Sequence, residues 1–496
     1  MGIVIRQSFK NSIVTYIGVI IGTINVLFLY NKFLSAEQLG LFTALTSFPL
    51  VFASVAHLGT PHVAIRFFSQ FHDENEKNNG FLMYLFVLPL LGFGLFLGVY
   101  AICSHWFTAI YVHNSPLLVN YYWVFPFLTF SLVYQVIFEA YSRVHLRIVV
   151  PAIVRELCLK LANSALALLY AANFLNFNQL LIGVVLVNFL ALIVLIAYIK
   201  FLGKLFLKID LSFIKKPVFK QMIRYGLWTM IGGATASALP HLEKLMLPAY
   251  EGGLEKTAIF NIALSIGMVI VIPRNAIAAI SEPLLAAAWK NKELSQIGLI
   301  YKKSALNLLI IGLLLFLGVW CNIDSIFNLI PNSSIYQKGK FVVLFVGLYS
   351  VFDMGTGLNS EILRNSPYYK IDLSFYIIRF IILVLANLVL IPLYSYNGAA
   401  LAMLISIIAY NLIKFVFIKQ KLGFQPFDST FLKVCVLALV TYCIATYLPT
   451  NNNSLTATLF AVCIKSLCVL FIFGGGVYYF KFSPDFNDQI QKITRR

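Results

Sequence analysis

Phe81–Trp106 reads FLMYLFVLPLLGFGLFLGVYAICSHW and contains no Asp, Glu, Lys or Arg. A helix rises 1.5 Å per residue, so about 20 apolar residues cover the roughly 30 Å of a bilayer's hydrocarbon core. Lys77 precedes this segment, whereas no Lys or Arg lies between it and the next apolar segment, which begins at Tyr121. The segment therefore predicts a transmembrane helix with a cationic start and a neutral end.

Counting Phe81–Trp106, the sequence contains fourteen apolar segments, most of them close to the length needed to cross a bilayer. Together they predict an all-α integral membrane protein with fourteen transmembrane helices. The expected spans are Ser12–Phe33, Leu39–Val63, Phe81–Trp106, Tyr121–Tyr141, Ile153–Phe174, Leu180–Tyr198, Met222–Leu247, Ile259–Trp289, Ala305–Trp320, Phe341–Leu363, Leu373–Leu393, Ala399–Phe417, Phe431–Leu448 and Leu455–Phe480.

The cations fall almost entirely into every second gap between these spans. One face of the membrane receives 29 of the 37 Lys and Arg residues, and three more lie inside spans. Cytoplasmic loops are enriched in Lys and Arg, so we expect both termini in the cytoplasm. The opposite face receives only five cations, which are Lys32, Lys244, Lys256, Lys338 and Lys340.

The composition excludes several classes of protein. With 60% hydrophobic and 11% charged residues, the chain has too little polar surface for a soluble globule of 496 residues. A net charge of +18 would suggest nucleic acid in a soluble protein, but cations spread over cytoplasmic loops set topology and contact anionic lipid headgroups instead. The chain has no P-loop, G-x-S-x-G, H-E-x-x-H or C-x-x-C motif, and we expect no enzymatic activity, no cofactor and no metal site.

The longest cytoplasmic connection divides the chain into two lobes. It runs from Lys200 to Arg224 and carries seven cations against one acid, Asp210. Phe9, Lys10 and Ile13 match Phe219, Lys220 and Ile223 in spacing and type, which favours a parallel repeat of six spans around a central cavity. We predict an N-lobe at 1–203, a basic linker at 204–220, a C-lobe at 221–420 and an appended helix pair with a cytoplasmic tail at 421–496.

Charges inside the hydrocarbon are candidate functional residues, because a charge at that depth needs a wet cavity or a partner. The deepest cations are Arg274, which follows Pro273 in span eight, Arg379 in span eleven and Lys465 in span fourteen. Pro273 predicts a bend. Arg66, at the cytoplasmic mouth of span two, suits topology and a phosphate-binding vestibule equally well.

Acidic residues within spans are fewer than cations. Glu139, Glu282 and Glu361 are expected to pair with cations or to reach the cytoplasmic edge, although Glu139 is also a candidate for ion or proton coupling. Asp353, near the middle of span ten, has no cation within a turn on its own helix. It is either a protonatable or Na⁺-binding site or the partner of Arg379.

Asn387–Ala402 reads NLVLIPLYSYNGAALA. It resembles the asparagine, Leu-Ile-Pro, Gly-Ala-Ala signature between spans eleven and twelve of Wzx-type polysaccharide-export flippases, which belong to the MOP superfamily. Pro392 should stop one helix, Asn397 and Gly398 should form a short turn, and small residues should let the next helix pack closely. The N-terminal region is also similar to that family, with Glu37-Gln38-Leu39-Gly40 and with Leu58-Gly59-Thr60 leading to Arg66.

The resemblance implies a flippase of the bacterial inner membrane. It would move undecaprenyl-diphosphate-linked oligosaccharide from the cytoplasmic to the periplasmic leaflet by alternating access, for O-antigen of lipopolysaccharide, capsule or exopolysaccharide. Arg274, Arg379, Lys465 and Arg66 would bind the diphosphate and sugars, with Asp353 and Glu139 as coupling residues. The partners implied are the lipid-linked oligosaccharide, membrane lipids and polysaccharide polymerase machinery, without nucleic acid.

Two alternatives stay open. A cation-coupled drug or metabolite exporter of the same fold would need acidic sites in its lumen, whereas the deep charges here are mainly basic. A polytopic polymerase or ligase would be expected to carry a large extracytoplasmic loop with catalytic charges. The largest such loop, 321–340, offers only Asp324, Lys338 and Lys340.

Overall fold

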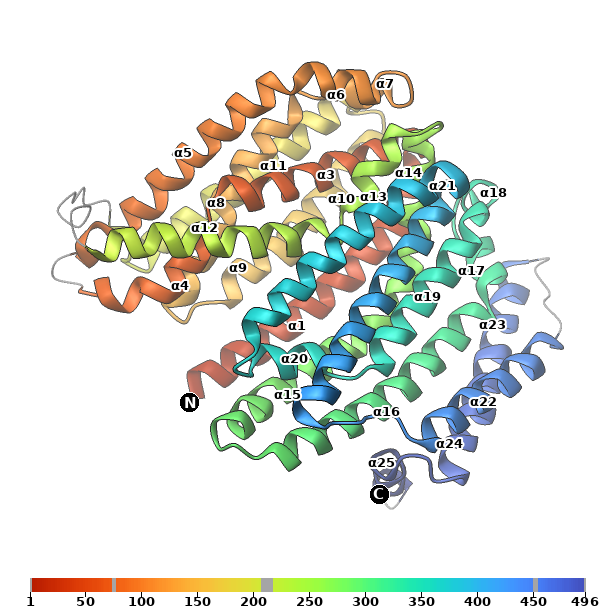
Figure 1. Ribbon diagram of the computed structural model, residues 1–496. Coiled ribbons are helices and arrows are strands. Elements are labelled where there is room, and N and C mark those ends of the chain that lie inside the picture. Colours follow the sequence, from red (N-terminus) through yellow and green to blue (C-terminus); the bar gives the residue numbers. More distant parts are fainter. Residues whose placement is uncertain (1, 74–76, 207–216, 449–453, 495–496) are drawn as a thin grey trace. The chain divides into compact units, whose positions relative to one another are not determined.

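The computed structural model describes residues 2–73, 77–206, 217–448 and 454–494, whose regular secondary structure is entirely helical (Figure 1). Most of the basic linker, at 207–216, and the terminal Arg495 and Arg496 lie outside these residues. Eleven helical segments in the described parts are long and apolar enough to cross a membrane. The expected all-helical membrane class is therefore confirmed.

The helices form two compact units, Met1–Ala258 and Ile259–Arg496. The first unit is built around α8, which packs on α3, α4, α5 and α11, while α12 packs on α3 and α4. Its helices are α1 (Gly2–Ile24), α2 (Asn31–Phe33), α3 (Ala36–Ala56), α4 (Thr60–Phe71), α5 (Phe81–Ile102), α6 (Ser104–Tyr111), α7 (Pro116–Asn120), α8 (Val124–Val144), α9 (Val149–Ile153), α10 (Leu159–Ala171), α11 (Phe177–Phe201), α12 (Pro217–Ala238), α13 (Leu242–Met246) and the start of α14 (Gly253–Gly267).

The second unit is organised by α19, which packs on α16 and α21. The C-terminal helices α22 and α23 pack on α16, where Leu309, Val434 and Phe473 share one buried apolar cluster. Its helices are α15 (Ile272–Lys290), α16 (Leu294–Trp320), α17 (Ile323–Leu329), α18 (Ser333–Tyr336), α19 (Lys340–Gly355), α20 (Asn359–Arg364), α21 (Tyr369–Leu422), α22 (Ser429–Thr446), α23 (Leu455–Val469), α24 (Gly475–Tyr479) and α25 (Pro484–Thr494).

The expected second span is broken at residues 57–59, between α3 and α4. Leu58 and Gly59 have φ angles of 49° and 73°, and the Gly59 N–H donates to His57 Nδ1 at 3.0 Å. A Cβ atom on Gly59 would lie 2.0 Å from the carbonyl oxygen of Gly226 in α12. Only glycine combines this positive φ with such a close backbone approach, so the break also fixes the packing of α12 on the α3–α4 junction.

Helix α21 is a hairpin of two antiparallel arms that meet at Ser395 (Figure 1). Ser395 has φ 55° and ψ −134°, and a Cβ atom on Gly398 would lie 1.9 Å from the carbonyl oxygen of Leu390. Ala399 and Ala400 are fully buried. The predicted break between two helices and their close packing are confirmed, since Gly398 and the small Ala399 and Ala400 leave room for the arms to approach. The break lies at Ser395, however, so the predicted stop at Pro392 and turn at Asn397 and Gly398 are wrong in position: Pro392 lies inside the first arm, and Asn397 and Gly398 already belong to the second.

A second irregularity precedes Arg274. Between α14 and α15 the chain forms a 3₁₀ turn at Met268–Val271, and Pro273 occupies the first turn of α15. Proline has no N–H to donate at this position and its fixed φ suits a helix start. The helix is thus irregular just before the position where Pro273 predicts a bend, and Arg274 lies in the first turn of α15.

Candidate functional site

Six charged side chains of the second unit gather within its membrane-spanning helices, three cations and three carboxylates. They come from α15, α19, α20 and both arms of α21. They are Arg274, Arg379, Lys414, Asp353, Glu361 and Asp372. All six are buried or largely buried, so the cluster is electrically balanced in a region where a lone charge would be costly.

Arg274 lies between two carboxylates. Its Nε is 3.1 Å from Asp353 Oδ2 and its Nη2 is 3.4 Å from Glu361 Oε2. The exposed fractions of the three side chains are 12%, 17% and 6%. Glu361 thus pairs with a cation as expected, whereas the alternative that gave Asp353 to Arg379 as an ion-pair partner is corrected, because the bend before α15 delivers Arg274 to Asp353.

Hydrogen bonds continue from Asp353 through three polar side chains. Asn411 Nδ2 donates to Asp353 Oδ1 at 3.1 Å, and Asn359 Nδ2 donates to Asn411 Oδ1 at 2.8 Å. Ser360 Oγ donates to Asn359 Oδ1 at 3.3 Å. These neutral groups join the two charged ends of the cluster across α19, α20 and the second arm of α21.

The far end of this chain is Lys414. Its Nζ donates to Ser360 Oγ at 2.7 Å and lies 2.7 Å from Asp372 Oδ1, and its side chain is 0% exposed. The alternation of cations along the sequence predicts Lys414 among the residues of the cytoplasmic face. The structure adds that its side chain is buried, because Asp372 on the opposite arm of the α21 hairpin supplies a counter-charge.

Arg379 differs from the other two cations. Its Nη2 donates to the hydroxyl of Tyr349 at 3.0 Å, and its guanidinium lies 5.3 Å from the ring centroid of Tyr410. Lys414 Nζ lies 4.0 Å from the same ring, so Tyr410 contacts two cations. Within the described residues Arg379 forms no ion pair, and its buried Nε has no hydrogen-bond partner.

Lys465 lies apart from this cluster. It is a buried residue of α23, a helix that packs on α16 and α17, and 5% of it is exposed. The structure therefore brings Arg274, Arg379 and Asp353 together and leaves Lys465 in a different part of the second unit.

In the first unit, Arg66 and Glu139 lie on different helices and contact different partners. Arg66 is exposed on α4, with its guanidinium 4.4 Å from the ring centroid of Tyr225. Glu139 on α8 lies 2.7 Å from Arg155, which also reaches Glu156 at 3.0 Å. Glu139 therefore pairs with a cation, as expected. Glu282 in the second unit also does so, since it lies 3.3 Å from Arg364.

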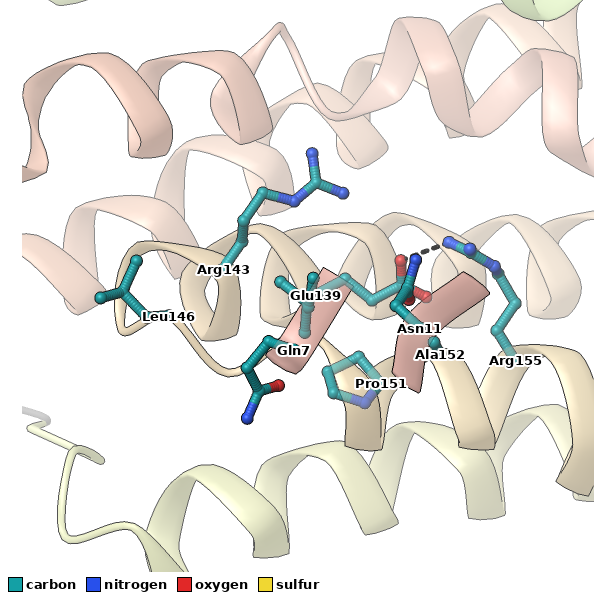
Figure 2. Close-up of a pocket in the computed structure, with 9 residues that line it drawn as sticks. Gln7, Asn11, Glu139, Arg143, Leu146, Pro151, Ala152 and Arg155 are labelled. Atoms are coloured by element: carbon teal, nitrogen blue, oxygen red, sulfur yellow. Dashed lines mark hydrogen bonds and ion pairs between the residues drawn. The ribbon is translucent and has the colours of Figure 1, made fainter. Parts of the chain in front are cut away.

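Glu139 and Arg155 line an open pocket of about 370 Å³, which we call the α1–α8 pocket (Figure 2). Its polar lining is completed by Gln7 and Asn11 of α1 and by Arg143 of α8. Gln7 lies just before the candidate span Lys10–Phe33 and Asn11 at its start, and Arg143 lies at the end of the candidate span Val124–Val144. The pocket therefore lies at the ends of two candidate spans.

The model of a protein family described as "polysaccharide biosynthesis protein" matches residues 4–289, more than half of the chain. The chain belongs to this family. The resemblance to Wzx-type flippases drawn from its sequence is thereby confirmed at the level of the family. No curated protein matches the chain.

Solved structures with the fold of this polysaccharide biosynthesis protein are transporters. The lipid II flippase MurJ in its inward closed conformation superposes with a TM-score of 0.70 at 14% identity, covering 94% of this chain and 99% of that one. An inward-facing MATE multidrug transporter gives 0.62 at 15% identity, covering 82% and 94%. A MOP superfamily transporter from Pyrococcus furiosus gives 0.55 at 14%, covering 85% and 95%. The family member is thus a multi-pass membrane protein with a MOP-type fold.

Sequence reasoning missed several polar residues of this polysaccharide biosynthesis protein. In the second unit they are Asn359, Ser360, Asp372, Asn411 and Lys414. In the first unit, Glu156 pairs with Lys160 at 2.9 Å, and Lys160 Nζ also donates to the carbonyl oxygen of Gly18. Polar residues that share one face of an apolar span could have indicated them. Asn411 and Lys414, for example, are three residues apart and so lie on the same face of their helix. No group of His, Cys, Asp and Glu suited to a metal occurs in the described parts of the chain.

Proposed function

We propose that this chain is a flippase that moves undecaprenyl-diphosphate-linked oligosaccharide from the cytoplasmic to the periplasmic leaflet of the inner membrane, for surface polysaccharide biosynthesis. The family and the MOP-type fold support a flippase. The observation that carries the choice of cargo is Arg379, a largely buried guanidinium with no carboxylate at ion-pair distance in the described residues. A diphosphate would give this guanidinium the direct ion-pair contact that it lacks.

The topology proposed is fourteen spans with both termini cytoplasmic. The two arms of α21 each have the length of a span, and two further runs, α9–α10 and α12, add to the eleven strongly apolar segments. In the proposed cycle, the lobes 1–203 and 221–420 rock so that the substrate site opens alternately to the two sides of the membrane. Residues 421–496 form an appended pair of helices with a cytoplasmic tail. Arg274, Arg379, Arg66 and Lys465 are proposed to contact cargo at different stages, and Glu139 stays a candidate coupling residue.

Arg274 is neutralised by Asp353 and Glu361 in the structure. This pairing suggests how cargo binding could be coupled to the binding of a proton. A diphosphate that binds Arg274 must displace these carboxylates or meet them protonated, because like charges repel strongly in a region of low dielectric. Protonation of Asp353 would release Arg274 for cargo, and loss of that proton would favour cargo release. We therefore propose Asp353 as the proton-coupling residue.

The same contacts weigh against the rival functions. An exporter of cationic drugs needs a carboxylate free to meet its cargo, whereas Asp353, Glu361 and Asp372 are all paired. A polymerase would use charged residues of its largest extracytoplasmic loop. There Asp324 lies 2.7 Å from Lys340, as a partly exposed surface pair.

The test is Arg379→Gln, measured as translocation of lipid-linked oligosaccharide in proteoliposomes at matched protein level. Arg147→Gln is the control, because Arg147 is exposed in the first unit and forms no ion pair with a described residue. We expect Arg379→Gln to lower the rate by about tenfold or more, as for loss of a charge-assisted hydrogen bond to cargo, and Arg147→Gln to change it little. Equal rates for wild type and Arg379→Gln would refute the proposed anion site.

A further inference from the structure

The α1–α8 pocket contains one guanidinium, that of Arg143, that makes no direct ion pair with a described residue. Arg155 is held by Glu139 at 2.7 Å and Glu156 at 3.0 Å, and Glu156 is also held by Lys160 at 2.9 Å. Arg143 forms no ion pair or hydrogen bond through its side chain within the described residues. Figure 2 shows it extended away from the Glu139–Arg155 pair. The pocket lining thus carries one free positive charge beside a carboxylate that is already paired.

Two side-chain amides of the same pocket are also available to a ligand. Gln7 Oε1 is buried with no hydrogen-bond partner, and the Asn11 amide makes no hydrogen bond to a described residue. A buried acceptor without a donor is costly, so a hydroxyl of a ligand would be stabilising there. Amides and a carboxylate oxygen are the groups that hydrogen-bond sugar or glycerol hydroxyls.

The rest of the lining suits a lipid. Ile148, Pro151 and Ala152 of the α8–α9 turn and α9 form an apolar side to the pocket. The pocket lies at the ends of the candidate spans Lys10–Phe33 and Val124–Val144. A phosphate beside Arg143, hydroxyls beside Gln7 and Asn11, and a carbon chain toward the apolar side would satisfy every group of the pocket.

We propose that the α1–α8 pocket binds a phosphodiester- or diphosphate-linked, hydroxyl-bearing lipid headgroup, with Arg143 contacting the phosphate. Such a headgroup comes either from the proposed cargo or from a bilayer lipid such as phosphatidylglycerol. If it is the cargo, the pocket is an entry site at the membrane surface, separate from the buried cluster of the second unit; this reading alone rests on the proposed function.

The experiment measures binding of two probes, undecaprenyl diphosphate and phosphatidylglycerol, to the purified full chain by native mass spectrometry. The variant is Arg143→Ala, and the matched control is Arg147→Ala, an exposed arginine of the same turn that does not line this pocket. Neither arginine has a described ion-pair partner, so both variants should retain wild-type thermal stability. Gln7→Leu is a second variant that tests the hydroxyl contact without changing charge.

We expect Arg143→Ala to weaken binding about tenfold, as for loss of a charge-assisted hydrogen bond. Gln7→Leu should weaken the binding of phosphatidylglycerol about threefold and leave that of undecaprenyl diphosphate, which carries no sugar or glycerol hydroxyl, unchanged. An effect on undecaprenyl diphosphate alone assigns the pocket to cargo, and an effect on both probes assigns it to lipid headgroups in general. Unchanged binding of both probes, or equal loss in Arg147→Ala, overturns the proposal. Translocation by the wild-type chain is a separate readout, so failure of the pocket and failure of the flippase function are distinguishable.

Discussion

Lys414 Nζ lies 2.7 Å from Asp372 Oδ1, with the two residues on opposite arms of the α21 hairpin. The rings of Tyr376 and Tyr410, one turn further along each arm, have centroids 5.2 Å apart. The arms therefore meet in a fixed antiparallel register, and that register determines which charges of the second unit are neighbours.

Lys414→Met should destabilise the protein by about 3–5 kcal/mol, because it leaves the buried Asp372 carboxylate without its counter-charge. The double variant Lys414→Met with Asp372→Leu should recover most of the loss. Thermal unfolding of the purified protein in detergent measures both. Lys419→Ala is the control, since Lys419 is exposed on the same arm. A single variant as stable as wild type would show that the pair contributes nothing to folding.

Asp353→Asn should tighten the binding of undecaprenyl diphosphate by about tenfold, because it removes an anion that competes for Arg274. It should also abolish any dependence of transport on a proton gradient. Binding and transport are measured on the same preparation, with Asp324→Asn in the exposed pair with Lys340 as control. Weaker binding in Asp353→Asn would mean that this carboxylate positions Arg274 for cargo instead of competing with it.

Gly59→Ala should cost about 2–4 kcal/mol, because the new Cβ would lie 2.0 Å from the Gly226 carbonyl oxygen and the backbone has φ 73°. Gly94→Ala on α5 is the matched control, since nothing lies within 4 Å of its Cβ position. The comparison is made by thermal unfolding and by expression level. If both variants unfold at the same temperature, the α3–α4 break tolerates rearrangement and does not fix α12.

Docking of α25 should depend on pH. A hydrogen bond from Lys303 lowers the pKa of Asp485, partial burial raises it, and Asn307 lowers it further, with a net decrease. A carboxyl with a lowered folded-state pKa adds stability above its ordinary pKa of about 4, and this stability is lost as pH falls through the lower, folded value. Hydrogen exchange at 484–494 should therefore lose protection in acid.

Asp485→Asn should remove that dependence while leaving exchange in α22 unaffected. Asp428→Asn provides a comparison. Burial raises the pKa of Asp428, but Lys302 and the backbone N–H groups of Phe431 and Thr430 lower it overall. Its effect should appear at the start of α22, which it caps. Acid-sensitive exchange that persists in Asp485→Asn would assign the pH dependence to another titratable group, whereas wild-type protection that does not change with pH would assign the docking to apolar contacts of Phe482 and Phe486.

Hydropathy and turn chemistry predicted much of the fold, because span length, Pro392 and Gly398 act locally. The α21 hairpin and the bend before Arg274 followed from such local rules. The pairing of charges did not, because it depends on which helix faces which. Asp353 forms its ion pair with Arg274 of α15, and Lys414 is buried against Asp372 of the opposite arm of α21.

The candidate site was therefore predicted in part. Arg274, Arg379 and Asp353 share one cluster, while Lys465 lies on α23 apart from it. Burial depth could be read from position within a span, which is why all three cations were identified as deep. Their neighbours include Asn359, Ser360 and Asn411, whose uncharged side chains do not indicate a counter-ion and whose hydrogen-bonding role arises only from packing of α20 on α21.

The balance of charges in the second unit has an electrical consequence. Moving one elementary charge through a 100 mV membrane potential involves about 2.3 kcal/mol, but three cations and three carboxylates that move together carry no net charge. We therefore expect that the conformational change by which the empty transporter returns to its starting state does not depend on voltage through this cluster. Only the loaded stroke, with its acidic headgroup, would then respond to the potential.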